Sequence, residues 1–131
     1  MDVYEKIKIP LIAVEEVSID KIKDYGVLLY NIWKKVKNNL CKIDYLVEKP
    51  EPDEALSNLG ITGIYILDNK IFNYLKKVKK VKNNEFQLTD ALNLYAKEND
   101  LYASTFKGKR YDMVTKELWY KTYKEFLKYI K

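Results

Sequence analysis

Short continuous apolar runs along this chain are separated by segments whose apolar residues recur at helical spacing. The apolar runs fall at 9–14, 27–30, 41–47, 59–67 and 101–106. Runs of this length, rich in Ile, Val, Leu and Tyr, predict strands. The uninterrupted run at 9–14 predicts a strand buried on both faces, and the turn at 37–39 predicts a hairpin.

Helical spacing appears in the segments between these runs. The helices expected from caps and periodicity are the tail of one ending at Lys6, a short one at 18–23, and longer ones at 68–79, from about Thr89 onward, and at 116–130. The alternation of strands and helices, without internal repeats, predicts one compact α/β unit. An aromatic stripe at Trp119, Tyr123 and Phe126 favours a core or a dimer contact over a cofactor site.

The charge of the chain is positive but carried almost entirely by lysine. The formal net charge is +5 and Arg110 is the only arginine. Direct reading of bases relies mainly on arginine, so we expect no nucleic-acid partner. The densest lysine run, at 76–82, is typical of the solvated C-terminal end of a helix.

Several classes of site are excluded by composition. The chain has no histidine, which excludes histidine metal ligands and histidine-dependent triads. Cys41 is the only cysteine, which excludes an internal disulfide and fits a reducing compartment. Because no run approaches about 20 apolar residues and the first residues lack an apolar signal region, we expect a cytoplasmic protein without a membrane partner.

The segment 47–50, Val-Glu-Lys-Pro, places an acid and a base together at the end of a predicted strand. Glu48 can accept hydrogen bonds from ligand hydroxyls, and Lys49 can neutralise a phosphate. An exposed ion pair at a strand end is the alternative. The strand that follows carries Gly60 and Gly63, where a backbone or a ligand must approach closely.

Four blocks in order resemble the sugar nucleotidyltransferases. They are IAVEEV followed by YGV, then VEKPEPDEALSNLGITGIYIL, then E-x-QLTDAL, then FKGKRYD, together spanning much of residues 9–112. The Glu-Lys-Pro and Thr-Gly-x-Tyr patterns are shared by the thymidylyltransferase branch, whereas QLTD and GKRYD favour the UTP–glucose-1-phosphate uridylyltransferase branch. The resemblance implies the C-terminal part of a Rossmann-like fold, an α/β structure with a mixed sheet flanked by helices.

The resemblance also implies roles for individual residues. Gly26 presents its backbone to the sugar, Glu48 and Glu85 bind the sugar, and Lys49 holds its phosphate. Asp112 binds Mg²⁺, and Lys49 and Asp112 are the catalytic residues. From the residues alone, Gly26 could be only a helix stop, Glu85 a first-turn helix carboxylate and Asp112 the cap of the last helix.

The chain departs from the family pattern at four positions. Val114 and Leu118 stand where the family has glycine, Ile64 where the uridylyl branch has arginine, and Leu56 where it has proline. These changes affect the loop around Asp112, the predicted metal ligand.

The family's Gly-rich nucleotide loop and its other metal-binding Asp lie upstream of the matched blocks, and the first glycine here is Gly26. We therefore expect residues 1–131 to be a sugar-phosphate-binding half, inactive alone. In UDP-glucose synthesis from UTP and glucose 1-phosphate, it would need a separate nucleotide-binding half. The alternative is a non-catalytic remnant that binds sugar phosphate or serves in oligomerisation. Because the missing half would continue the sheet, an apolar edge or face should be exposed, and we expect a homo-oligomer that covers it, with the helix at 119–130 as one candidate contact.

Overall fold

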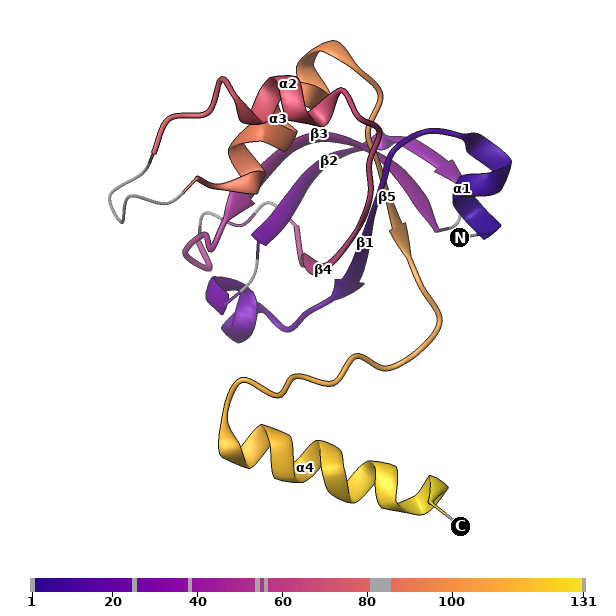
Figure 1. Cartoon of the computed structure of the whole chain (residues 1–131), viewed down its shortest axis with the longest axis vertical. Helices are drawn as coiled ribbons and strands as arrows, with labels where there is room; N and C mark the ends of the chain where they lie inside the picture. The colour runs from indigo at the N-terminus through magenta and orange to yellow at the C-terminus, as the bar shows by residue number, and fades with distance from the viewer. Residues whose placement is uncertain are drawn as a thin grey trace.

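Five strands form one sheet in the computed structural model of this chain, which describes residues 2–24, 26–37, 39–53, 55, 57–80 and 86–130 (Figure 1). The strands are β1 (Leu11–Glu16), β2 (Gly26–Lys37), β3 (Leu40–Glu48), β4 (Leu59–Ile66) and β5 (Tyr102–Thr105). Their order is β1-β4-β2-β3-β5, and β5 pairs back onto β1, so the sheet closes into a barrel. The β1–β5 pairing is parallel and the others are antiparallel.

The helical elements lie outside this sheet. They are α1 (Asp2–Ile7), the 3₁₀ turn η1 (Ile19–Asp24), α2 (Ile71–Leu75), α3 (Leu88–Glu98), α4 (Lys116–Phe126) and the 3₁₀ turn η2 (Leu127–Tyr129). Figure 1 shows α2 and α3 together against one side of the sheet and α4 set apart, joined by an extended segment. The predicted α/β class, with a mixed sheet and flanking helices, is confirmed. Within the described ranges, no helix has the length and apolar character needed to cross a membrane.

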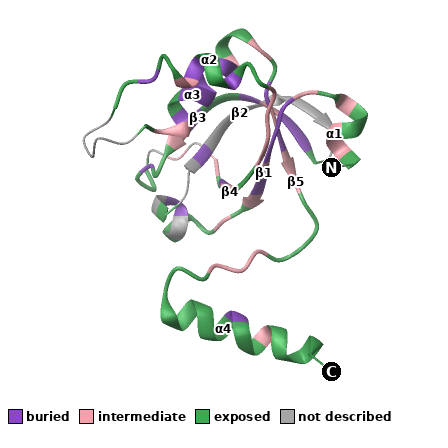
Figure 2. Cartoon of the chain, viewed as in Figure 1, coloured by how far each residue is buried: buried purple, intermediate pink, exposed green. Residues whose placement is uncertain are grey.

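The hydrophobic core lies between the inner face of the sheet and the helices α2 and α3. Ile12 and Val14 of β1 are almost completely buried, as are Leu92 and Tyr95 of α3. Figure 2 shows buried stretches on both β1 and α3. Their inward positions follow the two-residue period of a strand and the three- to four-residue period of a helix. The core therefore holds α3 against the sheet.

A bulge in β4 explains the glycine at its centre. Between the pairs Ile12–Tyr65 and Val14–Ile61, β1 advances by two positions and β4 by four. Gly63 within this bulge has φ of +81°, a backbone conformation that glycine adopts without steric cost. The Thr62 hydroxyl donates to the Ala13 carbonyl at 2.9 Å, so this β1 acceptor is paired.

The helix predicted to run to about Lys79 is shorter in the structure. It ends at Leu75, and the amides of Lys77 and Val78 donate to the carbonyls three residues earlier, which tightens the chain into a final turn. Val78 is buried against the core. This tighter turn carries Val78 into the core while the neighbouring lysines remain exposed.

The aromatic stripe of the last helix does not enter the core of this chain. Trp119 is 53% exposed and Phe126 48% exposed, and Thr122 is the only buried residue of α4. Figure 2 shows α4 coloured as exposed over most of its length. The prediction of a core contact is therefore wrong within the described residues, because the aromatic side chains of this face remain about half exposed. The alternative, a contact with another copy, stays a prediction.

Candidate functional site

The ends of four strands meet at one end of the barrel and bring distant parts of the sequence together. Gly26 at the start of β2 pairs with Glu48 at the end of β3, and Val27 pairs with Gly60 of β4. Gly60 also pairs with Glu15 near the end of β1. Because neighbouring strands lie about 4.8 Å apart, these residues form one continuous rim. The rim contains two of the predicted sugar-site residues, Gly26 and Glu48, side by side.

The carboxylate of Glu48 is held by a side chain of α3. The Thr89 hydroxyl donates to Glu48 Oε2 at 2.7 Å. Thr89 is the second residue of α3, so the carboxylate lies at the helix N-terminus, where the helix dipole favours negative charge. Tyr65 of β4 lies close enough to be affected: burial and then the negative charge of Glu48 raise the pKa of its phenol.

A second side chain of α3 fixes the strand that carries Glu48. Asn93 Oδ1 accepts from the amide of Leu46 at 2.7 Å, and Asn93 Nδ2 donates to the Leu46 carbonyl at 2.8 Å. Asn93 is buried, and it lies one helical turn beyond Thr89. The end of β3 is therefore tied to α3 through both its backbone and a side chain.

Lys49 lies in a backbone conformation that favours glycine. Its φ is +46°, which costs a non-glycine residue about 1 kcal/mol or more, and it stands between the paired Glu48 and the buried Pro50. The side chains of Glu48 and Lys49 are both exposed. The sharp turn thus ends the strand and leaves an acid and a base accessible at the rim.

Asp112 occupies a different part of the same end of the molecule. Its Oδ1 accepts from the amide of Val114 at 3.2 Å, and its Oδ2 lies 3.9 Å from Nη1 of Arg110. Nε of Arg110 donates to Glu15 Oε1, so this arginine links Asp112 to the end of β1. The helix cap considered for Asp112 is instead Thr115, whose hydroxyl accepts from the amide of Leu118.

The predicted Mg²⁺ has only part of a site among these residues. Asp112 is a hard oxygen ligand of the required kind, but an arginine and a backbone amide face its two oxygens. Within the described ranges, no three acidic or thiol side chains gather where a metal ion could be held. The described residues therefore do not form a complete Mg²⁺ site.

The remaining predicted residue, Glu85, lies outside the described residues. Three residues of the site were not singled out from the sequence: Thr89, Tyr65 and Asn93. A signal was present for two of them, because Thr89 belongs to the QLTDAL block and Tyr65 to the Thr-Gly-x-Tyr pattern. Asn93 has no such signal, since an asparagine in a helix is ordinarily solvated.

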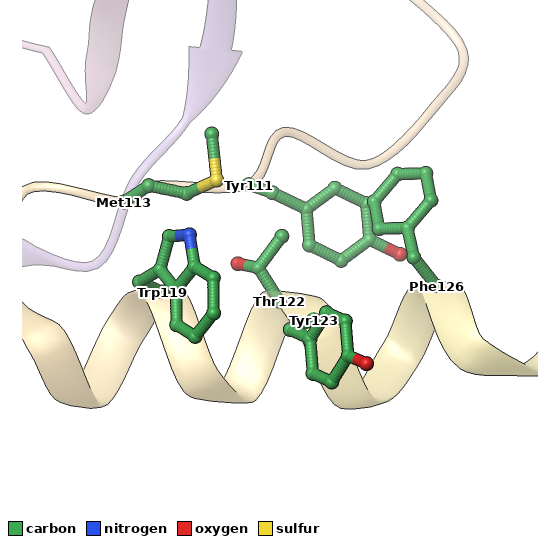
Figure 3. Close-up of a pocket in the computed structure, with 6 residues that line it drawn as sticks. All are labelled: Tyr111, Met113, Trp119, Thr122, Tyr123 and Phe126. Atoms are coloured by element: carbon green, nitrogen blue, oxygen red, sulfur yellow. The ribbon is translucent and has the colours of Figure 1, made fainter.

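Two of the hollows beside α4 differ in chemical character, and neither contains Glu48 or Lys49. One of about 340 Å³ has polar and charged residues, including Glu15, Ser18, Arg110, Asp112, Lys121 and Glu125. The other, of about 460 Å³, is lined by Tyr111, Met113, Trp119, Thr122, Tyr123 and Phe126. Figure 3 shows Tyr111 and Met113 above the helix, facing Trp119 and Thr122. The first suits a polar ligand and the second an apolar one.

Sequence comparison places the chain among known proteins. Residues 4–122 match the family model described as "Nucleotidyl transferase". A UTP–glucose-1-phosphate uridylyltransferase of Pseudomonas aeruginosa is 36% identical over 109 residues, which cover 83% of this chain and 38% of that protein. One of Streptococcus pneumoniae is 39% identical over 122 residues, covering 93% of this chain and 40% of that protein.

Solved structures give the same result at the level of the fold. A UDP-glucose pyrophosphorylase complexed with UDP-glucose has a TM-score of 0.89 and 36% identity, covering 98% of this chain and 48% of that chain. The UTP-bound enzyme from Acinetobacter baumannii has a TM-score of 0.78 and 26% identity, covering 95% and 42%. The resemblance found in the sequence is confirmed, and the chain spans less than half the length of these relatives.

Proposed function

This chain belongs to the nucleotidyl transferase family, and from that premise we propose that residues 1–131 are the sugar-phosphate-binding half of a UTP–glucose-1-phosphate uridylyltransferase. The observation that carries the proposal is the pairing of Gly26 with Glu48 at the rim, next to Lys49. Three residues from two predicted motifs thereby lie together although 22 positions separate Gly26 from Glu48. The relatives' names supply the substrate class, glucose 1-phosphate and UTP.

Each residue of this group has a chemical task in the proposal. Glu48 accepts hydrogen bonds from hydroxyls of the sugar, and Gly26 lets the ligand approach the backbone where a side chain would collide. Lys49 neutralises the phosphate of glucose 1-phosphate. In the full reaction an oxygen of that phosphate attacks the α-phosphorus of UTP and pyrophosphate leaves, so Lys49 also orients the nucleophile.

The donor side of the reaction needs residues beyond these 131. The four glycines, Gly26, Gly60, Gly63 and Gly108, form no Gly-rich phosphate loop. Without a grip on the triphosphate, the chain lacks most of the ~8 kcal/mol or more by which enzymes lower a barrier. We propose that a nucleotide-binding half, in the same or another polypeptide, supplies this grip and the remaining ligands of a Mg²⁺ ion shared with Asp112.

The exposed face of α4 supports a partner of this kind. Trp119, Tyr123 and Phe126 present apolar surface that the barrel does not cover. Covering such side chains yields about 25 cal/mol per Å² of apolar area removed from water. Either a nucleotide-binding half or a second copy of the chain would cover this face.

Titration of glucose 1-phosphate followed by ¹H–¹⁵N NMR tests the sugar site. We expect shifts at Gly26, Glu48 and Lys49, and we expect Lys49→Ala to weaken binding by ~1–3 kcal/mol because a charge-assisted bond to phosphate is lost. Lys79→Ala, an exposed lysine of the run at 76–82, is the matched control and should leave affinity unchanged. Shifts confined to that run would mean nonspecific anion binding and would contradict the proposal.

Pyrophosphate release from UTP and glucose 1-phosphate with Mg²⁺ tests the division of labour. We expect no turnover by the chain alone and turnover when a separately expressed nucleotide-binding half is added. Turnover by the pure chain would refute the claim that it lacks the donor site.

A second candidate function is a non-catalytic remnant that binds sugar phosphate or only associates with other copies. The contact of Arg110 with Asp112 favours it, because an arginine at the proposed metal ligand opposes cation binding. This candidate would be supported if the chain bound glucose 1-phosphate but showed no turnover, either alone or with the separately expressed nucleotide-binding half.

A further inference from the structure

We propose that Thr89 is a positioning residue for Glu48, and that its hydroxyl decides how the site recognises sugar hydroxyls. The inference rests on the proposed sugar-phosphate site and goes beyond it, since that proposal gave tasks in sugar-phosphate binding only to Gly26, Glu48 and Lys49. Its starting point is the 2.7 Å hydrogen bond between Thr89 Oγ1 and Glu48 Oε2.

The direction of this bond follows from the chemistry of its partners. An ionised carboxylate has no hydrogen to donate, so the Thr89 hydroxyl must be the donor. One lone pair of Oε2 is thereby used, and Oε1 remains for hydroxyl donors of a ligand. The arrangement selects a ligand that offers hydroxyl hydrogens to Glu48, as the ring of a sugar does.

Because Thr89 is buried, its side chain is held in place and can in turn orient the exposed side chain of Glu48. Thr89 is 7% exposed whereas Glu48 is exposed at the rim. A free glutamate samples many rotamers, and ordering it on binding costs conformational entropy. Because Thr89 already holds one oxygen, the ligand meets a carboxylate whose orientation is set beforehand.

Asn93 keeps this geometry constant. It bonds both backbone groups of Leu46, two residues before Glu48, from the next turn of the same helix. The distance between the start of α3 and the end of β3 is therefore set independently of the Thr89 bond. Removing the Thr89 hydroxyl should release the Glu48 side chain without moving the strand that carries it.

The test compares Thr89→Val, which keeps the shape and removes the donor, with Thr89→Ser, which keeps the donor. Glucose 1-phosphate is titrated into each variant of residues 1–131 by NMR, with inorganic phosphate as a probe of Lys49 alone. We expect Thr89→Val to weaken glucose 1-phosphate binding about three- to tenfold, Thr89→Ser to stay near the parent, and phosphate binding to be unchanged in both. Thr62→Val, which loses a comparable hydroxyl bond at β1, is the matched control and should bind as the parent does.

Two further readouts separate positioning from a merely structural bond. Analogues of glucose 1-phosphate that each lack one ring hydroxyl should reveal one hydroxyl whose removal matters less in Thr89→Val than in the parent. In the ligand-free protein, scalar couplings of the Glu48 side chain should show one rotamer in the parent and Thr89→Ser but averaging in Thr89→Val.

Each result decides a distinct claim. Equal affinity of parent and Thr89→Val, or an equal loss of phosphate and sugar-phosphate binding, would overturn the role of Thr89. No binding of glucose 1-phosphate by the parent would instead overturn the proposed function. If glucose 1-phosphate does not bind, the rotamer measurement still has a meaning. A single Glu48 rotamer in the parent that becomes averaged in Thr89→Val would show that the Thr89–Glu48 bond is only a structural contact.

Discussion

The helices α3 and α4 are both 11 residues long and amphipathic, yet one is embedded and the other is exposed. In α3, Leu92 and Tyr95 are almost fully buried, and Asn93 and Thr89 bond the end of β3. In α4, only Thr122 is buried. The sequence pattern is similar in the two helices, so the difference comes from what lies opposite each apolar face.

The aromatic residues of α4 contact one another and Tyr111 in the segment that precedes the helix. Trp119 and Tyr123 stack with ring centroids 5.5 Å apart, and Phe126 meets Tyr111 edge to face at 5.1 Å. These contacts cover part of the rings but leave Trp119 half exposed. The comparison teaches that an amphipathic helix specifies a contact, while the rest of the chain determines whether that contact is internal.

The sharpest test of the comparison is the same substitution in each helix. Leu92→Ala should lower the free energy of unfolding by ~2–5 kcal/mol, because it opens a cavity in the core. Leu118→Ala in α4, at a residue 36% exposed, should cost no more than ~1 kcal/mol. Urea unfolding followed by circular dichroism measures both, and similar losses would mean that α4 belongs to the same cooperative core.

The polar contacts of α3 allow a second test. Asn93→Ala should cost ~2–3 kcal/mol, since it leaves the buried amide and carbonyl of Leu46 without their partner. Asn73→Ala in α2, an exposed asparagine, is the control and should change stability by less than ~0.5 kcal/mol. If both variants unfolded at the same urea concentration, the hydrogen bonds of Asn93 to Leu46 would not stabilise the contact between α3 and β3.

Removal of α4 should affect association more than folding. We expect a variant ended at Val114 to lose only about 1 kcal/mol of stability, because α4 buries little surface against the barrel. If the chain associates through the aromatic face of α4, this variant should sediment as a monomer at concentrations where the parent forms oligomers. An oligomer that persists without α4 would place the contact elsewhere.

The smallest effect is expected from pH at the ion pairs of α4. A hydrogen bond to Lys109, then the charges of Lys109 and Lys128, lower the pKa of Glu125 below its usual 4.5. A lowered pKa in the folded state means that the contribution is present above pH 4.5 and is lost as the pH falls through the folded value. The NMR signals of Tyr111, whose hydroxyl donates to Glu125 Oε2 at 3.3 Å, should therefore shift below pH 4.5. Glu125→Gln should abolish that shift, and Glu117→Gln should leave it in place.

The sequence by itself determined where most strands and helices lie and which helix faces are apolar, because local periodicity and turn chemistry act over a few residues. It did not determine the extent of α2, which ends at Leu75 rather than near Lys79. The motif blocks also identified Gly26, Glu48, Lys49 and Asp112 as candidates and gave the correct family. The α/β class with a mixed sheet followed from the same signals. These features depend on neighbours in the chain, and a single sequence contains them.

Only the tertiary structure decided which distant residues meet. The pairing of Gly26 with Glu48, the bond from Thr89 to Glu48 and the contact of Arg110 with Asp112 depend on sheet register and helix docking. No local pattern encodes such registers, since they minimise the energy of the whole packed chain. The same reason explains α4: its aromatic stripe specified an apolar contact, but only the assembled fold leaves Trp119, Tyr123 and Phe126 about half exposed.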